Sequence, residues 1–177
     1  MYDVVAIGEL LVDFACRSTD DDGYPVLAAH PGGAPANFLA VLARYGLKTA
    51  LLAKVGNDAF GRLLRRTVER EGIDTAGVVV DDAAFTTLAF VTLDENGERD
   101  FSFARKPGAD MLLRYDELDL SLIDRTRVFH FGSVSMTDEP SRDATRRAAA
   151  YARSRGGLLT YDPNLRIPLW KDLAQAR

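Results

Sequence analysis

Short, mostly apolar runs recur along the chain, and each predicts a strand; the continuous run at residues 4–7 is typical of a strand buried in a parallel sheet. These runs are residues 4–7, 50–55, 78–80, 128–131 and 158–161. Other stretches repeat apolar residues at helical spacing, and they are residues 36–45, 60–71 and 140–155. Because strands and helices alternate, the pattern predicts an α/β domain built on a mainly parallel sheet.

Local signals set the ends of the predicted helices. Gly46 and Gly72 follow the first two helical stretches, and glycine is common just past a helix C-terminus. Asp58 precedes the second stretch, where its side chain can accept hydrogen bonds from the first helical amides. Residues 170–177 have the pattern of an amphipathic helix with no stop signal, so we expect the chain to be cut within a larger domain.

Two segments interrupt the alternation of strands and helices. Strand candidates at 10–16 and 24–29 are separated by a polar turn. Two further β-rich runs, 86–93 and 100–103, flank Asn96-Gly97, a dipeptide typical of a tight hairpin turn. We therefore expect a small second β-sheet, inserted from about residues 10–30 and 86–104.

Composition excludes several classes of protein. The formal net charge of −4 gives no basic surface for nucleic acid or an anionic membrane. Cys16 is the only cysteine, so the chain has no internal disulfide and no cysteine-rich metal site, which fits a reducing cytoplasm. No stretch reaches the roughly 20 apolar residues of a membrane-spanning helix. We expect a cytoplasmic protein without nucleic-acid or membrane partners.

Residues 30–37 read H-P-G-G-A-P-A-N and come directly before a predicted helix. Gly32 and Gly33 let the backbone approach a ligand closely and offer its N–H groups. Asn37 falls in the first helical turn, where its amide can both donate and accept hydrogen bonds. A polyol suits such a site because each hydroxyl also does both. The pattern equally allows a tight turn with an exposed Asn37.

Further polar residues follow predicted strands, where ligands bind in open α/β sheets. Asp13 lies in the apolar run L-L-V-D-F-A, where a buried carboxylate needs hydrogen-bond donors; on the wet face of a strand it needs none. Asp162, Asn164 and Arg166 follow the last predicted strand. Arg105 follows the predicted hairpin. An arginine fork binds phosphates or carboxylates, although ordinary surface charge also explains both arginines.

The common cofactor and metal motifs are missing from the sequence. No G-x-x-x-x-G-K-[ST], G-x-G-x-x-G or H-E-x-x-H pattern occurs. A Rossmann-type oxidoreductase is therefore disfavoured, and we assign no metal ligand in this chain.

Longer motifs carry a more specific signal. They are G-G-A-P-A-N at 32–37 with Gly46, V-G-N-D-A-F-G at 55–61 and V-A-I-G-E-L-L-V-D at 5–13. Together they resemble the N-terminal signature and first strand of the ribokinase-like (PfkB) family of carbohydrate kinases. G-E-R-D-F-S-F-A-R-K-P-G-A-D-M-L-L at 97–113 and Y-D-P-N-L-R-I-P-L-W at 161–170 look most like bacterial fructokinases. The resemblance covers residues 1–177 and implies the N-terminal part of one ribokinase-like α/β domain.

The resemblance implies a sugar kinase that transfers the γ-phosphoryl of ATP to a primary hydroxyl of a sugar. Fructose is the expected substrate, fructose 6-phosphate the product, and ATP with Mg²⁺ the cofactors. The alternatives are 2-keto-3-deoxygluconate kinase, ribokinase and a non-catalytic sugar-binding module. The family's G-A-G-D motif, which supplies the general base and anion hole, does not occur here. We therefore expect no catalytic base in residues 1–177 and no activity from this chain alone.

The same resemblance assigns roles to particular residues. Arg105 would reach the sugar from the inserted sheet, and Arg166 would stabilise the transition state. Asp162 would support its neighbours after the last strand. The inserted sheet would act as a lid that excludes water, and lids of this family often pair between subunits, which implies a homodimer. The residues implied to bind substrate are Asp13, Gly32, Gly33, Asn37, Arg105, Asn164 and Arg166.

Overall fold

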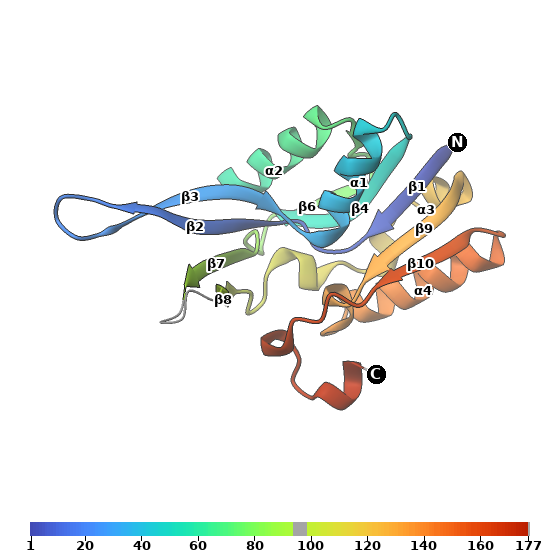
Figure 1. The fold of residues 1–177 in the computed structure, drawn as a ribbon. Helices are drawn as coiled ribbons and strands as arrows, with labels where there is room; N and C mark the ends of the chain where they lie inside the picture. Colours follow the sequence, from blue (N-terminus) through green and yellow to red (C-terminus); the bar gives the residue numbers. More distant parts are fainter. Residues whose placement is uncertain (94–98, 177) are drawn as a thin grey trace.

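The computed structural model describes residues 1–93 and 99–176, which form a main sheet with helices on both faces and a smaller second sheet (Figure 1). The strand order of the main sheet is β10-β9-β1-β4-β5, and β6 also pairs with β4. Every one of these pairs is parallel, which confirms the predicted α/β architecture. The strands are β1 (Tyr2–Ile7), β4 (Thr49–Gly56), β5 (Ile73–Asp74), β6 (Val78–Asp81), β9 (Thr126–Gly132) and β10 (Leu158–Asp162).

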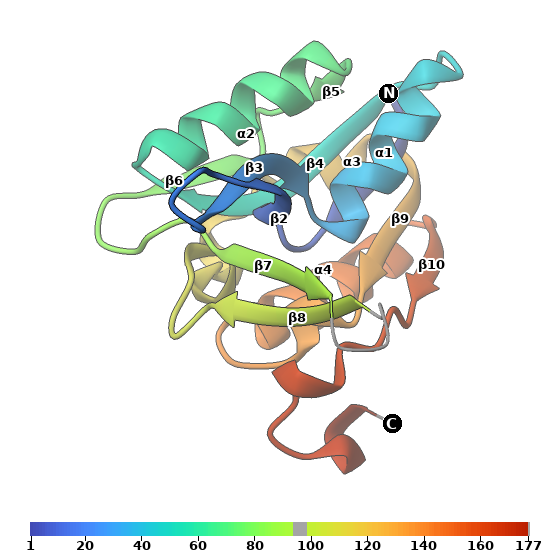
Figure 2. The same ribbon diagram turned by 60° about the vertical axis from the view of Figure 1, so that its left-hand side comes forward.

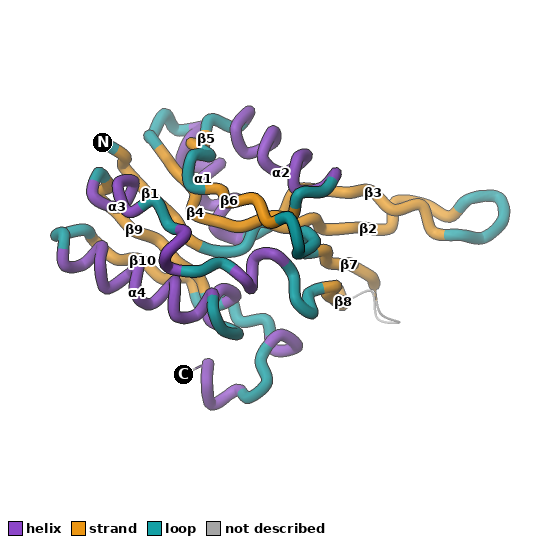
Figure 3. The backbone as a smooth tube through the Cα atoms, turned by 180° about the vertical axis from the view of Figure 1, so that it is seen from behind, coloured by secondary structure: helices purple, strands orange, loops and turns teal. Residues whose placement is uncertain are grey.

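Alternating residues of the central strands bury opposite faces of this sheet. Val4 and Ala6 of β1 join the core beneath α1 and α2, whereas Val5 and Ile7 join the core beneath α3 and α4. Figure 3 shows the main sheet between these two layers of helices. Because both faces are covered, β4 is buried along its whole length, and its sequence is apolar apart from Thr49 and Lys54. The helices are α1 (Ala34–Arg44), α2 (Ala59–Arg70), α3 (Leu120–Asp124) and α4 (Ser141–Ser154).

The second sheet has the strand order β3-β2-β7-β8. Its central pair, β2 with β7, is parallel, and the two outer pairs are antiparallel. The β2–β3 hairpin extends away from the main sheet, and β7 and β8 lie beside its base (Figures 1 and 2). The strands are β2 (Leu11–Thr19), β3 (Pro25–Gly32), β7 (Leu88–Leu93) and β8 (Arg99–Ala104). The predicted turn at Asn96-Gly97 lies outside the described residues.

Helix ends follow the local signals in part. Asp58 caps α2 as predicted, since its carboxylate accepts hydrogen bonds from the amides of Phe60 at 2.9 Å and Gly61 at 2.8 Å. The amphipathic helix expected over residues 170–177 is wrong for the described residues. One short 3-10 helix, η5 (Leu173–Ala176), forms there instead, and its turn is closed by a hydrogen bond from the Gln175 N–H to the Asp172 carbonyl. Another short 3-10 helix, η4 (Ile167–Leu169), precedes this range.

Three other short 3-10 helices, which the sequence pattern did not predict, lie in the connections of the main sheet. They are η1 (Ala109–Leu112), η2 (Tyr115–Glu117) and η3 (Val134–Met136).

Among the described residues, no helix combines the length and apolar character needed to cross a membrane.

Candidate functional site

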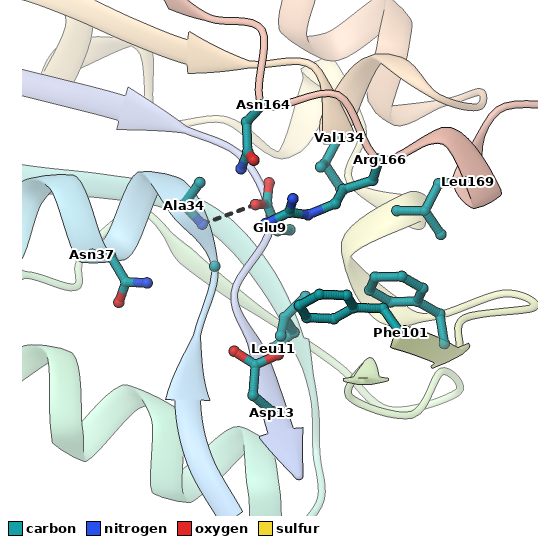
Figure 4. Close-up of a pocket in the computed structure, with 12 residues that line it drawn as sticks. Glu9, Leu11, Asp13, Ala34, Asn37, Phe101, Val134, Asn164, Arg166 and Leu169 are labelled. Atoms are coloured by element: carbon teal, nitrogen blue, oxygen red, sulfur yellow. Dashed lines mark hydrogen bonds between the residues drawn. The ribbon is translucent and has the colours of Figure 1, made fainter. Parts of the chain in front are cut away.

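A small cavity lies where the two sheets meet. β1 of the main sheet ends at Ile7 and β2 of the second sheet begins at Leu11, so the chain passes directly from one sheet to the other. The cavity has a volume of about 180 Å³. Figure 4 shows its polar side chains, which come from segments far apart in the sequence. The lining residues are Glu9, Leu11, Asp13, Gly33, Ala34, Asn37, Phe101, Phe103, Val134, Asn164, Arg166 and Leu169.

Asp13 brings a carboxylate to this cavity from β2, opposite His30 of β3. The side chain is half-buried, and burial raises the pKa of Asp13, while the nearby charges of Arg166 and His30 oppose that rise. Gly32 lies against the same carboxylate: a Cβ at Gly32 would stand 2.2 Å from Oδ2 of Asp13. Gly32 is not a lining residue of this cavity, and its lack of a side chain leaves room for Asp13.

Gly33 joins β3 to α1 in a backbone conformation that favours glycine, with φ of 112°. A Cβ there would stand 2.3 Å from the carbonyl oxygen of Glu9, so the two backbone segments touch. Asn37 follows in the first turn of α1, where its backbone N–H donates a hydrogen bond to the Gly33 carbonyl at 3.0 Å. The Asn37 side chain is exposed and borders the cavity. This close packing places a bare backbone and an amide side chain on one wall.

The loop after β10 forms the opposite wall. Asp162 accepts a hydrogen bond from the Asn164 amide at 3.1 Å, and the Asn164 carbonyl accepts one from Ser133 Oγ at 3.3 Å. These bonds hold Asn164 at φ of 26°, an uncommon value for a residue other than glycine. Arg166 places its guanidinium carbon 5.2 Å from the centre of the Phe101 ring. Asn164 and Arg166 line the cavity, whereas Asp162 holds the turn behind them.

Arg105 differs from the expectation that it reaches the sugar. It is 5% exposed, does not line the cavity and forms a buried ion pair with Asp110 at 2.7 Å. Its remaining donors bond to Thr137 Oγ1 at 2.9 Å and the Val134 carbonyl at 3.3 Å. The reason is that Asp110 lies five residues further along the chain, on η1, where its carboxylate pairs with the Arg105 guanidinium. This pairing leaves Arg105 unavailable to a sugar in the cavity. Arg105 thus fastens the end of β8 to η1 and η3.

Glu9 is a wall residue that the sequence reasoning missed. It follows Gly8 at the carboxyl end of β1, the part of a parallel sheet where ligands bind, and that position was the available signal. Its Oε1 accepts a hydrogen bond from the Ala34 amide at 2.9 Å (Figure 4). Burial raises the pKa of Glu9 to about 7. Phe101 and Phe103 were also missed as wall residues, because a strand pattern does not tell which face meets the main domain.

The cavity therefore brings together five of the predicted residues: Asp13, Gly33, Asn37, Asn164 and Arg166. The full set of lining residues mixes hydrogen-bond donors and acceptors and includes two carboxylates, of Glu9 and Asp13, and the guanidinium of Arg166. Such a set can bind several hydroxyls of one small polyol. Within residues 1–93 and 99–176, no group of three acidic, histidine or cysteine side chains could hold a metal ion.

Comparison with known proteins gives consistent relatives over the whole chain. The family described as pfkB family carbohydrate kinase matches residues 1–177. The chain is 47% identical over 176 residues to fructokinase-1 of Zea mays, covering 98% of this chain and 54% of that protein. It is 46% identical over 176 residues to probable fructokinase-3 of Arabidopsis thaliana, with coverages of 98% and 51%. The chain thus spans about half the length of the curated relatives it matches.

Solved structures give the same result. A fructokinase from Xylella fastidiosa superposes with a TM-score of 0.93 at 32% identity, covering 99% of this chain and 56% of that one. The structure of Xylella fastidiosa fructokinase with bound ATP superposes with a TM-score of 0.92 at 31% identity, with coverages of 99% and 57%. An Escherichia coli protein provisionally assigned as ribokinase II, in complex with ATP and Mg²⁺, gives a TM-score of 0.85 at 30% identity, with coverages of 94% and 54%.

Proposed function

Because the chain belongs to the pfkB family of carbohydrate kinases, we propose that the full-length protein transfers the γ-phosphoryl of ATP to a primary hydroxyl of a sugar. Full-length protein here means the product of the complete reading frame that contains residues 1–177. Fructose is the proposed substrate and fructose 6-phosphate the product, since the similar proteins include fructokinases at 46–47% identity. The observation that carries the proposal is the polar cavity between the two sheets.

In this proposal the cavity binds and orients the sugar. Asp13 accepts hydrogen bonds from sugar hydroxyls. Burial raises the pKa of Asp13, and these hydrogen bonds would offset the free-energy cost of burying its carboxylate. The backbone around Gly33 and the amide of Asn37 supply further donors and acceptors. Asn164 and Arg166 face the end of the sugar that carries the acceptor hydroxyl, where the Arg166 guanidinium can neutralise charge on the transferred phosphoryl group. Holding the acceptor hydroxyl in place is the main task of a protein in phosphoryl transfer.

The remaining chemistry is assigned to the part of the family fold that this chain does not match. We expect the general base and the binding of ATP and Mg²⁺ to come from there, because the G-A-G-D motif of the family does not occur in residues 1–177. ATP with Mg²⁺ would supply the transferred phosphoryl group. The residues described here would bind the acceptor sugar.

The cations near the cavity bear on the choice of sugar. A keto-acid sugar such as 2-keto-3-deoxygluconate needs a positive partner for its carboxylate, and the sequence offered Arg105 and Arg166. Arg105 is already neutralised by Asp110, so Arg166 is left as the lining guanidinium, and the carboxylates of Glu9 and Asp13 line the same cavity. This arrangement favours a neutral sugar over an anionic one.

The second sheet is proposed to act as a lid and as a dimer surface. Its β2–β3 hairpin exposes apolar side chains, including Tyr24, Val26 and Leu27. Pairing with a second copy would cover them. Light scattering of the full-length protein tests this point, with a dimer mass expected and a monomer mass contradicting it. The proposed location is the cytoplasm.

A coupled assay of ADP formation by the full-length protein, run with fructose, ribose and 2-keto-3-deoxygluconate, tests the function. We expect the highest kcat/KM on fructose. Absence of turnover on all three sugars would contradict a kinase, and sugar binding without turnover would establish a sugar-binding module instead. Residues 1–177 alone are expected to show no sugar-dependent ADP formation, and appreciable turnover by them would place the base within this chain.

A further inference from the structure

Glu9 is an acidic residue of the cavity wall that the proposed sugar contacts leave unused. Its side chain lies at the N-terminus of α1, where Oε1 accepts the Ala34 amide hydrogen bond at 2.9 Å. The residue is 4% exposed, and its other carboxyl oxygen, Oε2, is buried without a hydrogen-bond partner among the described residues. One half of this carboxyl group is therefore satisfied by the fold and the other half is not.

Such an arrangement is costly for a charged group. In the described part of the chain, the other unpartnered buried polar atoms belong to the hydroxyls of Thr49 and Thr145 and the indole of Trp170, all of which are neutral. A carboxylate without a partner loses more hydration energy than a hydroxyl does. Burial accordingly raises the pKa of Glu9 to about 7. A buried group left unsatisfied at a cavity wall calls for a partner from within the cavity.

We infer that Glu9 is a further binding residue of this cavity, with Oε2 accepting a hydrogen bond from one hydroxyl of the bound sugar while Oε1 stays on the Ala34 amide. The inference rests on the proposed sugar-binding function. Oε2 is closed to solvent in this structure, so the carboxyl group must turn slightly about its Cγ–Cδ bond, by an angle that keeps Oε1 within hydrogen-bond distance of the Ala34 amide. The last torsion of a glutamate side chain is broad, which makes that turn inexpensive.

The contact has a consequence that can be measured. A hydroxyl that donates to Oε2 stabilises the ionised carboxyl group, so it lowers the pKa of Glu9 in the complex. Sugar binding near pH 6.5 should therefore release protons from Glu9. The charged groups around it are Asp110, which raises the pKa of Glu9, and Arg105, which lowers it. Asp13 and Arg166 line the same cavity. A variant that replaces only Glu9 keeps all four of these charged residues.

The experiment compares wild-type full-length protein with Glu9→Gln and Asp58→Asn. Glutamine keeps an oxygen for the Ala34 amide but replaces the second acceptor by a donor. Asp58→Asn makes the same chemical change at the cap of α2, away from the cavity, and is the matched control. Isothermal titration with fructose at pH 8 should show at least 10-fold weaker binding for Glu9→Gln, and less than a twofold change for Asp58→Asn.

A second titration measures protons directly. Repeating it at pH 6.5 in buffers of different ionisation enthalpy gives the number of protons released on binding. Wild type and Asp58→Asn should release more protons than Glu9→Gln. A purely structural helix cap would change the melting temperature without moving fructose affinity or proton release.

The outcomes separate this inference from the proposed function. Equal affinity and equal proton release in wild type and Glu9→Gln would overturn the role of Glu9 alone. Fructose binding that depends on Glu9, without any ADP formation, would support Glu9 and contradict the kinase. Failure of wild type to bind fructose, ribose and 2-keto-3-deoxygluconate would contradict both.

Discussion

Replacing Gly33 by alanine should disturb the cavity more than the protein as a whole. The φ of 112° costs an alanine about 1–3 kcal/mol. The added Cβ would also stand 2.3 Å from the Glu9 carbonyl oxygen, below the 3.0 Å that such contacts require. The connection between the sheets must therefore shift by about 0.7 Å or more. Because a shift near 1 Å can cost about 100-fold in an oriented reaction, we expect fructose kcat/KM to fall by about 10- to 100-fold.

Gly46→Ala is the matched control for this prediction. Gly46 also has a positive φ, 85°, but an added Cβ would have no heavy atom within 4 Å. Both variants should lose stability in urea unfolding, the control by about 1–2 kcal/mol and Gly33→Ala by more. The control should keep fructose kcat/KM within twofold of wild type in the coupled assay. If Gly33→Ala lowered stability but left kcat/KM unchanged, the close contact between these backbones would have no part in the site.

Other predictions concern stability. The pKa of Glu9 is raised in the folded protein from its ordinary 4.5 to about 7, so the folded state binds a proton more tightly. Unfolding free energy should therefore fall as pH rises from 4.5 through 7, by about 3 kcal/mol relative to Glu9→Gln in urea titrations, and a flat difference would contradict the shift. Arg105→Met should cost about 3–5 kcal/mol in urea unfolding, because it leaves the buried Asp110 carboxylate without its positive partner. Adding Asp110→Leu should recover part of this loss, and additive losses would refute the pairing. Asp58→Ala should cost about 0.5–2 kcal/mol through loss of the α2 cap, and no change in the melting temperature would contradict that role.

The layered fold could be predicted because its signals are local and repeated. β4 reads as a mostly apolar run because both faces of it are buried, and α2 shows both its cap and its apolar face in the sequence. The sequence did not predict β5, which has only two residues, or α3, which has five. Elements this short are stabilised by packing against their neighbours, and they leave little periodicity to detect.

The site was predictable only where sequence position and strand ends coincide. Asp13 and the loop after β10 follow from the rule that ligands bind at the carboxyl ends of parallel strands. The burial of Arg105 depends on its meeting Asp110 and Thr137, which come from different elements. The unsatisfied oxygen of Glu9 depends on how the β1–β2 connection packs against Gly33, and no sequence pattern reports that contact.

The most direct test of the account is a crystal structure of the full-length protein with fructose bound. We expect a sugar in the cavity between the two sheets, with hydroxyls within hydrogen-bond distance of the Asp13 carboxylate and the Asn37 side-chain amide. Its acceptor hydroxyl should point toward Arg166. A sugar bound elsewhere, with this cavity holding only solvent, would contradict the central claim.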